Sequence, residues 1–196
     1  MNNDKVFNDK PAERKVLILG AGNTVMADEG IGPRCLEALH EWFDFPENVE
    51  MVDVGTMGLG ILDMLRDYTD VVVLDAAKDT GHPAGTVLLY TPEDLAHRQV
   101  LHSAHDMRFV DVLKSAKLMG IELDSVVIVA IQVKDMTEWV LELSPEVESA
   151  IPIACACALQ QLEVLGITPA QKTDASIDPE LWDALENFGL QVSEPS

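Results

Sequence analysis

The sequence lacks the long apolar runs that membrane-spanning and exported proteins carry. No stretch approaches the roughly 20 apolar residues that a membrane-spanning helix needs. The N-terminal segment, MNNDKVFNDKPAERK, is polar and has no apolar centre of the kind found in a signal peptide. We therefore expect a cytoplasmic protein with no membrane partner.

Basic residues are also scarce. The 196-residue chain has 13 Lys and Arg against 34 Asp and Glu, a formal net charge of −21. Such a charge repels nucleic acid and anionic membranes, so we predict no nucleic-acid partner. It would favour a basic or cationic partner, although solubility is the simpler explanation.

Cysteine is rare, and the three that occur are an odd number at positions unsuited to a disulfide or a metal site. Cys155 and Cys157 are two residues apart, so on a helix their side chains point to nearly opposite sides. Cys35 fits the buried face of a helix. We predict that all three pack in the core.

Several catalytic and nucleotide-binding motifs are missing. The segment GAGNTVMADEG follows an apolar run, but Val25 occupies the third glycine position of a dinucleotide-binding loop. The Gly-Lys-Ser or Gly-Lys-Thr of a P-loop is absent, and Asp28 and Glu29 would repel a phosphate. We therefore predict no nucleotide cofactor. There is also no H-E-x-x-H motif and no Ser-His-Asp or Cys-His order with supporting motifs.

The chain does contain short apolar, β-branched runs that alternate with helical patterns. Strands are expected at residues 16–19, 49–54, 71–74, 85–90 and 126–131. Helical periodicity follows at residues 31–43, 61–65, 109–116 and 147–165, the last interrupted by Pro152 and capped by Ser144. This alternation predicts a three-layer α/β sandwich with a mostly parallel, doubly wound sheet of about five strands and helices on both faces.

The domain organisation is simple. We expect a polar N-terminal extension over residues 1–14, a single α/β domain over 15–167, and an acidic tail over 168–196 with one short helix near 179–188. The length fits one domain with a full core.

Acidic side chains gather where the strands are expected to end. Glu29 follows the first strand, Asp53 ends the second, and Asp75 ends the third. In open α/β sheets, ligands bind beyond the carboxyl ends of the strands. His105 lies in the first turn of the following helix, behind an expected capping box of Ser103 and Asp106. The mixed oxygen and nitrogen set predicts a divalent-cation site with open positions. Each residue also has an ordinary explanation as a helix-start charge, a turn former or a capping-turn histidine.

Six segments together resemble the hydrogenase maturation endopeptidases. They are LILGAGNTVMADEGIGPRCLEAL, VDVGTMG, VVVLDAAKD, SAHDMRFVDVL, AIQ at 130–132 and LSPEV at 143–147, spanning residues 16–166. The resemblance implies an endopeptidase that removes a C-terminal extension from the nickel-loaded large-subunit precursor of a hydrogenase. The sequence departs from the family pattern at Arg108 and Val133.

The same resemblance implies roles for individual residues. Glu29, Asp75 and His105 would be the metal ligands, with nickel supplied by the substrate. Asp53 matches a further acidic position, and Asp53 or Asp75 would orient or deprotonate the attacking water in an aspartic-type reaction. We expect a monomer that docks transiently on the precursor.

Two other functions fit the residue pattern. One is a non-catalytic metal-binding or chaperone module on the same fold, and the other is a nucleotide-binding α/β domain. The pattern leaves open which hydrogenase is processed, which bond is cut, and whether activation of water or of the scissile carbonyl dominates.

Overall fold

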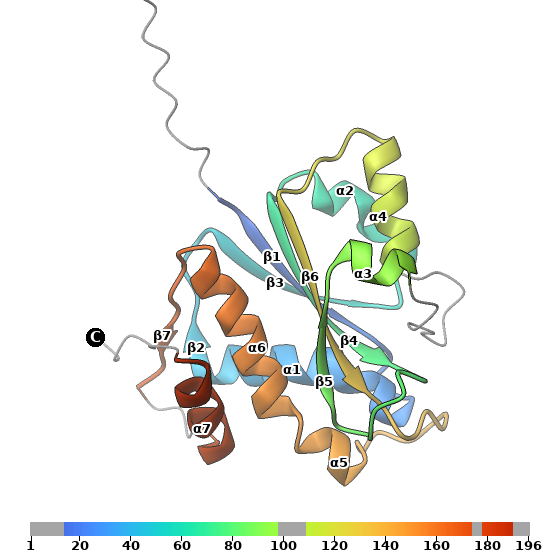
Figure 1. Cartoon of the computed structure of the whole chain (residues 1–196), viewed down its shortest axis with the longest axis vertical. Helices are drawn as coiled ribbons and strands as arrows, with labels where there is room; N and C mark the ends of the chain where they lie inside the picture. The colour runs from blue at the N-terminus through green and yellow to red at the C-terminus, as the bar shows by residue number, and fades with distance from the viewer. Residues whose placement is uncertain (1–13, 98–108, 174–177, 190–196) are drawn as a thin grey trace, which may run out of the picture.

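The fold is a five-stranded sheet with helices on both faces, seen in a computed structural model that describes residues 14–97, 109–173 and 178–189 (Figure 1). The strand order is β3-β1-β4-β6-β5, and β5 alone runs antiparallel to its neighbour. The strands are β1 (Val16–Ala21), β3 (Val49–Gly55), β4 (Asp70–Ala77), β5 (Val87–Tyr90) and β6 (Ser125–Gln132). The predicted fold class is confirmed.

The central strands are apolar because both of their faces are covered. All eight residues of β4 are buried, and the last five of β6 are buried as well. A strand covered on both sides reads as a continuous apolar run. The polar residues Asp70 and Asp75 explain why the apolar pattern of residues 71–74 is shorter than the strand.

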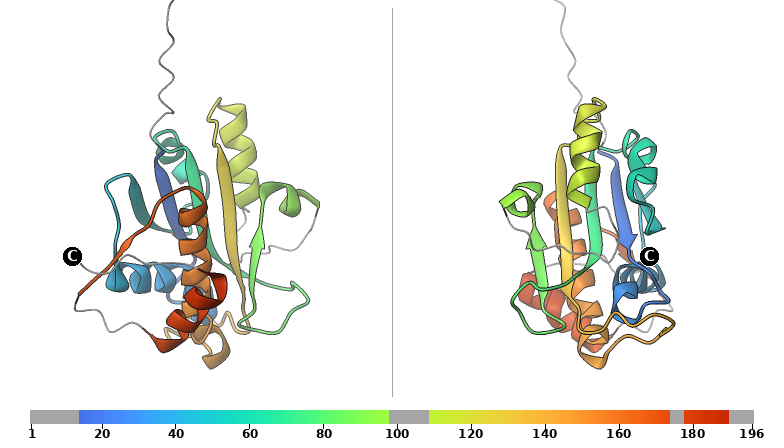
Figure 2. Two further views of the ribbon diagram at one scale, coloured as in Figure 1. Left: turned by 60° about the vertical axis from the view of Figure 1, so that its left-hand side comes forward. Right: turned by 90° about the vertical axis from the view of Figure 1, so that its right-hand side faces the viewer.

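Two groups of helices form the outer layers (Figures 1 and 2). One face of the sheet packs against α1 and α6, with α7 packed on α6, and the other face packs against α2 and α4. The helices and single turns are η1 (Ala27–Gly30), α1 (Ile31–Trp42), η2 (Gly58–Ile61), α2 (Leu62–Leu65), α3 (Pro92–His97), α4 (Phe109–Leu118), α5 (Pro145–Glu148), α6 (Ile151–Val164) and α7 (Pro179–Phe188). Cys35, Cys155 and Cys157 are buried and free, as predicted.

The long helical pattern after Ser144 is broken, as Pro152 predicts. It forms α5 and α6, with Pro152 in the first turn of α6, where its missing N–H is tolerated. The predicted side-chain cap is wrong. Ser144 precedes α5, but its hydroxyl makes no capping hydrogen bond there and instead donates to Asp28 Oδ2 at 3.0 Å.

The C-terminal tail packs on the domain. The predicted helix is α7, where Asp178 accepts a hydrogen bond from Glu180 N at 2.8 Å. Leu181 and Leu185 of α7 are buried in the core beside α1 and α6. A second, two-stranded sheet, which the sequence pattern does not predict, joins β2 (Phe43–Asp44) to β7 (Ala170–Gln171). The expected division at residue 167 is therefore crossed by core packing.

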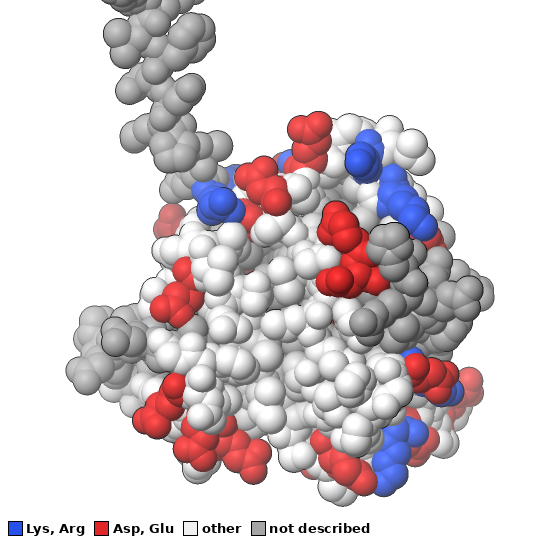
Figure 3. All heavy atoms as spheres, in the orientation of Figure 1, with Lys and Arg blue, Asp and Glu red and all other residues white. Residues whose placement is uncertain are grey.

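Acidic groups dominate the charged surface of the face shown in Figure 3, where they surround a largely uncharged centre. Within the described residues, no helix is long and apolar enough to cross a bilayer.

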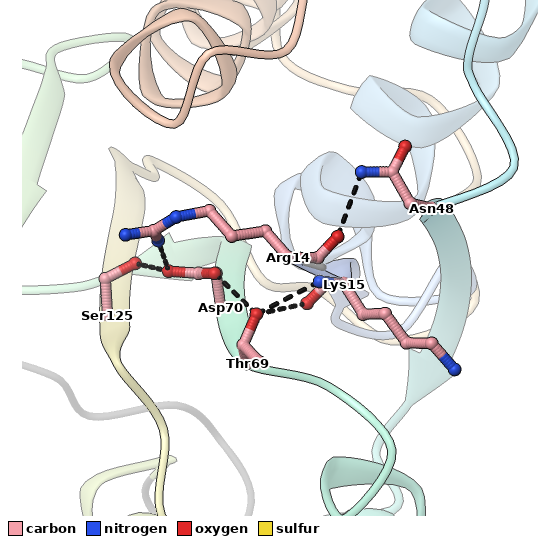
Figure 4. Close-up of polar contacts among 6 residues, drawn as sticks. All are labelled: Arg14, Lys15, Asn48, Thr69, Asp70 and Ser125. Atoms are coloured by element: carbon pink, nitrogen blue, oxygen red, sulfur yellow. Dashed lines mark hydrogen bonds and ion pairs between the residues drawn. The ribbon is translucent and has the colours of Figure 1, made fainter. Parts of the chain in front are cut away.

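One buried carboxylate stabilises the sheet at the amino ends of its central strands (Figure 4). Asp70 begins β4 and is fully buried. Its oxygens accept hydrogen bonds from Arg14 Nη1, Ser125 Oγ and Thr69 Oγ1, each at 2.7 Å. This cluster joins residue 14 of the N-terminal segment to the core, and its role is structural.

Candidate active site

The glycine-rich loop after β1 allows α1 to approach the sheet closely. Gly22 has a φ of +138°, and a Cβ placed on it would lie 1.9 Å from the carbonyl oxygen of Glu29. A Cβ on Gly32 would lie 2.2 Å from Ala21 O and 2.4 Å from Leu74 O. These glycines therefore serve close packing of the chain.

The two adjacent carboxylates of this loop point to different surroundings. Asp28 is fully buried and fastens the segment between β6 and α5. Its Oδ2 accepts hydrogen bonds from Lys134 N at 2.9 Å and Asp135 N at 2.8 Å. Its Oδ1 accepts from Ser144 N at 2.6 Å. The sequence pattern does not predict this role of Asp28, because its partners lie more than 100 residues away along the chain.

Glu29 instead faces a cavity that Asp75 also lines. The cavity has a volume of about 60 Å³ and lies at the carboxyl ends of β1 and β4. Glu29 and Asp75 are both buried, with exposed fractions of 1% and 9%. The remaining wall comes from the end of β1, the loop from β3 to η2, and the first turns of α4. The predicted convergence of these two carboxylates at the strand ends is present.

Asp75 has an unusual environment for a carboxylic acid. Burial raises its pKa to about 7, and the nearby charge of Glu29 contributes in the same direction, against a lowering by the Ala76 backbone hydrogen bond. Two close carboxylates in a poorly solvated site resist double ionisation. Near neutral pH, Asp75 can therefore gain or lose a proton, as a general acid or base must.

Asp53 lies elsewhere. Successive residues of a strand point to opposite faces, and it is Val54, not Asp53, that lines the cavity of Glu29 and Asp75. Asp53 is exposed and lines a separate hollow of about 620 Å³ between β3 and α1. Its Oδ1 accepts a hydrogen bond from Gly55 N at 2.8 Å. The structure does not bring Asp53 together with Glu29 and Asp75, and its catalytic role stays a prediction.

Comparison with known proteins identifies the family. Residues 33–161 match the family described as hydrogenase maturation protease.

The chain belongs to the hydrogenase maturation protease family.

Its relatives and structural neighbours in this family agree. The hydrogenase expression/formation protein HupD of Rhodobacter capsulatus is 33% identical over 172 residues, 85% of this chain and 81% of HupD. The hydrogenase maturating endopeptidase HybD of Escherichia coli superimposes with a TM-score of 0.73 at 27% identity, covering 82% of this chain and 99% of HybD. A hydrogenase 2 maturation peptidase from Thaumarchaeota archaeon SCGC_AB-539-E09 gives 0.58 at 31% identity, covering 78% and 99%. These matches confirm the protease interpretation and give the chaperone alternative no support.

His105 of this hydrogenase maturation protease lies outside the described residues, as do Ser103, Asp106 and Arg108. The described part of the chain contains no group of three or more His, Cys, Asp or Glu side chains arranged to hold a metal ion. Phe109 and Val112 line the cavity, so α4 begins beside Glu29 and Asp75. The ligand set of Glu29, Asp75 and His105 therefore stays a prediction.

The AIQ segment at residues 130–132 has a structural role here. Gln132 ends β6 and is buried. Its Oε1 accepts hydrogen bonds from Thr80 N, at 2.9 Å, and from Thr80 Oγ1, while its Nε2 donates to Val133 O at 2.7 Å. The side chain thus fixes the connection between β4 and β5 near the carboxyl ends of the strands.

Proposed function

We propose that this protease removes a C-terminal extension from the large-subunit precursor of a hydrogenase after nickel has been inserted. The observation that carries the proposal is the pair of buried carboxylates, Glu29 and Asp75, on one cavity at the carboxyl edge of the sheet. The family membership supplies the reaction class.

The two carboxylates fit a divalent cation carried by the substrate. Carboxylate oxygens and imidazole both coordinate divalent metals such as nickel. A bound cation would also remove the electrostatic penalty of placing Glu29 and Asp75 together in a buried site. His105 would complete the protein's contribution to the coordination shell. The precursor's own ligands would supply the rest, so we expect the isolated enzyme to purify largely metal-free.

Asp75 is the better candidate for proton transfer in this reaction. A cation bound at the site could polarise the scissile carbonyl or acidify a water molecule. Asp75 lines the cavity beside Glu29, whereas Asp53 lines the separate hollow beside α1. We therefore assign the aspartic-type role to Asp75, with Glu29 holding the substrate's cation.

A cleavage assay on nickel-loaded and nickel-free precursor tests the proposal. The wild-type enzyme should process the first and leave the second uncut. Glu29→Gln and Asp75→Asn should each lower kcat/KM on loaded precursor by roughly 100-fold or more. Asp53→Asn, a matched change outside the cavity, should keep most of the activity. Equal cleavage of both precursors would exclude nickel sensing, and complete loss in Asp53→Asn would restore Asp53 as the catalytic acid.

We expect the enzyme to act in the cytoplasm as a monomer that meets the folded precursor transiently. Analytical ultracentrifugation of the free enzyme should give a single monomeric species. A stable dimer at micromolar concentration would contradict this part of the proposal.

A further inference from the structure

The segment between β6 and α5, residues 133–144, holds large apolar side chains in solvent. Trp139 is 83% exposed and Leu141 is 55% exposed. Val25, in the loop after β1, is 37% exposed and lies beside Trp139, because Trp139 N donates a hydrogen bond to Val25 O at 2.7 Å. We call Val25, Trp139 and Leu141 the tryptophan patch. Large exposed apolar groups that gather on a surface commonly mark interaction sites.

Hydrogen bonds join the segment that carries Trp139 and Leu141 to the residues just before Glu29. Ala27 N donates to Val140 O at 2.7 Å, and Met26 and Val140 form a parallel β-bridge. The buried Asp28 carboxylate fastens the same segment at Lys134, Asp135 and Ser144. Figures 1 and 2 show this segment running beside the start of α1.

The backbone at the patch is held in an unfavourable conformation. Trp139 has a φ of +66° and Ala27 has a φ of +47°, in the left-handed region that favours glycine. Trp139 therefore has a backbone conformation that is unfavourable for a residue other than glycine, and its large apolar side chain is exposed to solvent. Strain of this kind concentrates at functional sites, and tryptophan is enriched among residues that dominate binding energy at interfaces.

The charges around the patch define the partner. Asp135, Glu138 and Glu142 are exposed around it. The two basic side chains near the patch are both paired: Lys134 with Glu146 at 2.6 Å, and Arg34, which lines a hollow with Leu141, with Glu37 at 2.9 Å. An apolar centre with an acidic border complements an apolar pocket with a basic border. The patch is also connected to the site through the backbone, because Val25 precedes the turn Ala27–Gly30 that holds Glu29.

We propose that the tryptophan patch is the docking surface for the folded body of the hydrogenase large-subunit precursor, with Trp139 inserted into an apolar pocket bordered by basic side chains. This inference rests on the proposed function and adds where the substrate binds. Docking here would bring the C-terminal extension to the cavity of Glu29 and Asp75 while leaving those carboxylates free for the reaction.

Steady-state cleavage of nickel-loaded precursor by Trp139→Ala tests the proposal. The KM should rise by roughly 10- to 100-fold, as for loss of an interface anchor, while kcat at saturation stays within about twofold. Trp139→Phe should recover much of the affinity. The matched control is Trp182→Ala on α7, a tryptophan with 39% exposure, which should leave KM within about twofold of wild type.

Each other outcome has a clear meaning. An unchanged KM in Trp139→Ala, or a loss confined to kcat, overturns docking at the patch while wild-type cleavage still supports the proposed function. Failure of the wild type to cut either precursor rejects the proposed function itself. A wild-type dimer that Trp139→Ala dissociates would show that the patch binds a second copy instead. If circular dichroism shows that Trp139→Ala is misfolded, Leu141→Ser carries the same test and should also raise KM.

Discussion

Asp28 and Glu29 are neighbours in the chain, yet only Glu29 lines the cavity that Asp75 also faces. Asp28 accepts hydrogen bonds from three backbone N–H groups and the Ser144 hydroxyl. A buried donor that loses its acceptor carries the full desolvation penalty. At the residue scale, Asp28 therefore stabilises the surface segment that carries Trp139, and Glu29 lines the cavity that it shares with Asp75.

The first prediction concerns Asp28→Ala. The variant should lose roughly 2–4 kcal/mol of unfolding free energy, because it leaves several buried donors without an acceptor. Urea denaturation measures the loss. Glu138→Ala, which removes an exposed acid from the same segment, should change stability by less than about 0.5 kcal/mol. Equal effects of the two substitutions would mean that the Asp28 hydrogen bonds contribute little.

Asp75 gives the second prediction, a pH dependence of stability. Its folded pKa is about 7, against an ordinary value of 3.8. Because the folded state binds this proton more tightly, the contribution of Asp75 is fully present below about pH 4 and is lost as the pH rises through 7. Asp75→Asn cannot ionise, so its stability relative to wild type should increase by about 3 kcal/mol between pH 5 and pH 8. Urea denaturation of the chelator-treated proteins at both pH values measures the difference. A constant difference would show that Asp75 titrates normally.

At the scale of elements, the site depends on how closely α1 crosses β1 and β4. The glycine of the helix's first turn, Gly32, touches both strands through backbone atoms, which cannot move aside as a side-chain end can. This contact fixes the direction of the turn that presents Glu29. A small displacement of α1 should therefore change the position of Glu29 in the cavity.

Gly32→Ala is the third prediction. Its Cβ would sit 2.2 Å from Ala21 O and 2.4 Å from Leu74 O, so α1 must shift, at a loss of roughly 3 kcal/mol. Gly60→Ala is the matched control, because its Cβ would meet only Met57 side-chain atoms at 3.5 and 3.7 Å. Thermal unfolding should separate the two variants clearly. Similar melting temperatures would indicate that α1 tolerates displacement.

The elements also show which parts of the fold and site the sequence predicts. β1, β4 and β6 are recognisable because burial on both faces demands apolar residues, and the break before α6 follows from Pro152. The pairing of β2 with β7 involves two residues on each side, too few for a pattern. The meeting of Glu29 and Asp75 is predictable because both residues lie at the carboxyl ends of strands in one sheet. The face that Asp53 occupies depends on the pleat at the end of β3, and the partners of Asp28 depend on long-range folding.

At the scale of the whole molecule, the C-terminal helix is part of the domain's stability. A chain that stops after residue 173 lacks α7. It loses the buried side chains of Leu181, Ala184 and Leu185, and the core residues that they cover become exposed. It should lose roughly 3–5 kcal/mol of unfolding free energy, the contribution of several buried apolar side chains. A chain that stops after residue 189 keeps α7 and should match wild type in urea denaturation. Equal stability of the two truncated chains would show that α7 contributes little to the unfolding free energy.

The net charge of −21 acts over the whole molecule and gives the last prediction. If the precursor presents a basic border to the tryptophan patch, the acidic surface should steer association, and salt should screen that attraction. We expect the association rate constant to fall by roughly tenfold between 50 and 500 mM salt, with a smaller change in dissociation. Stopped-flow binding to loaded precursor measures both constants. Glu138→Lys, beside the patch, should slow association more than Glu163→Lys on α6, although both variants have the same net charge. Equal slowing by the two reversals would show that total charge governs the encounter and that the patch does not direct it.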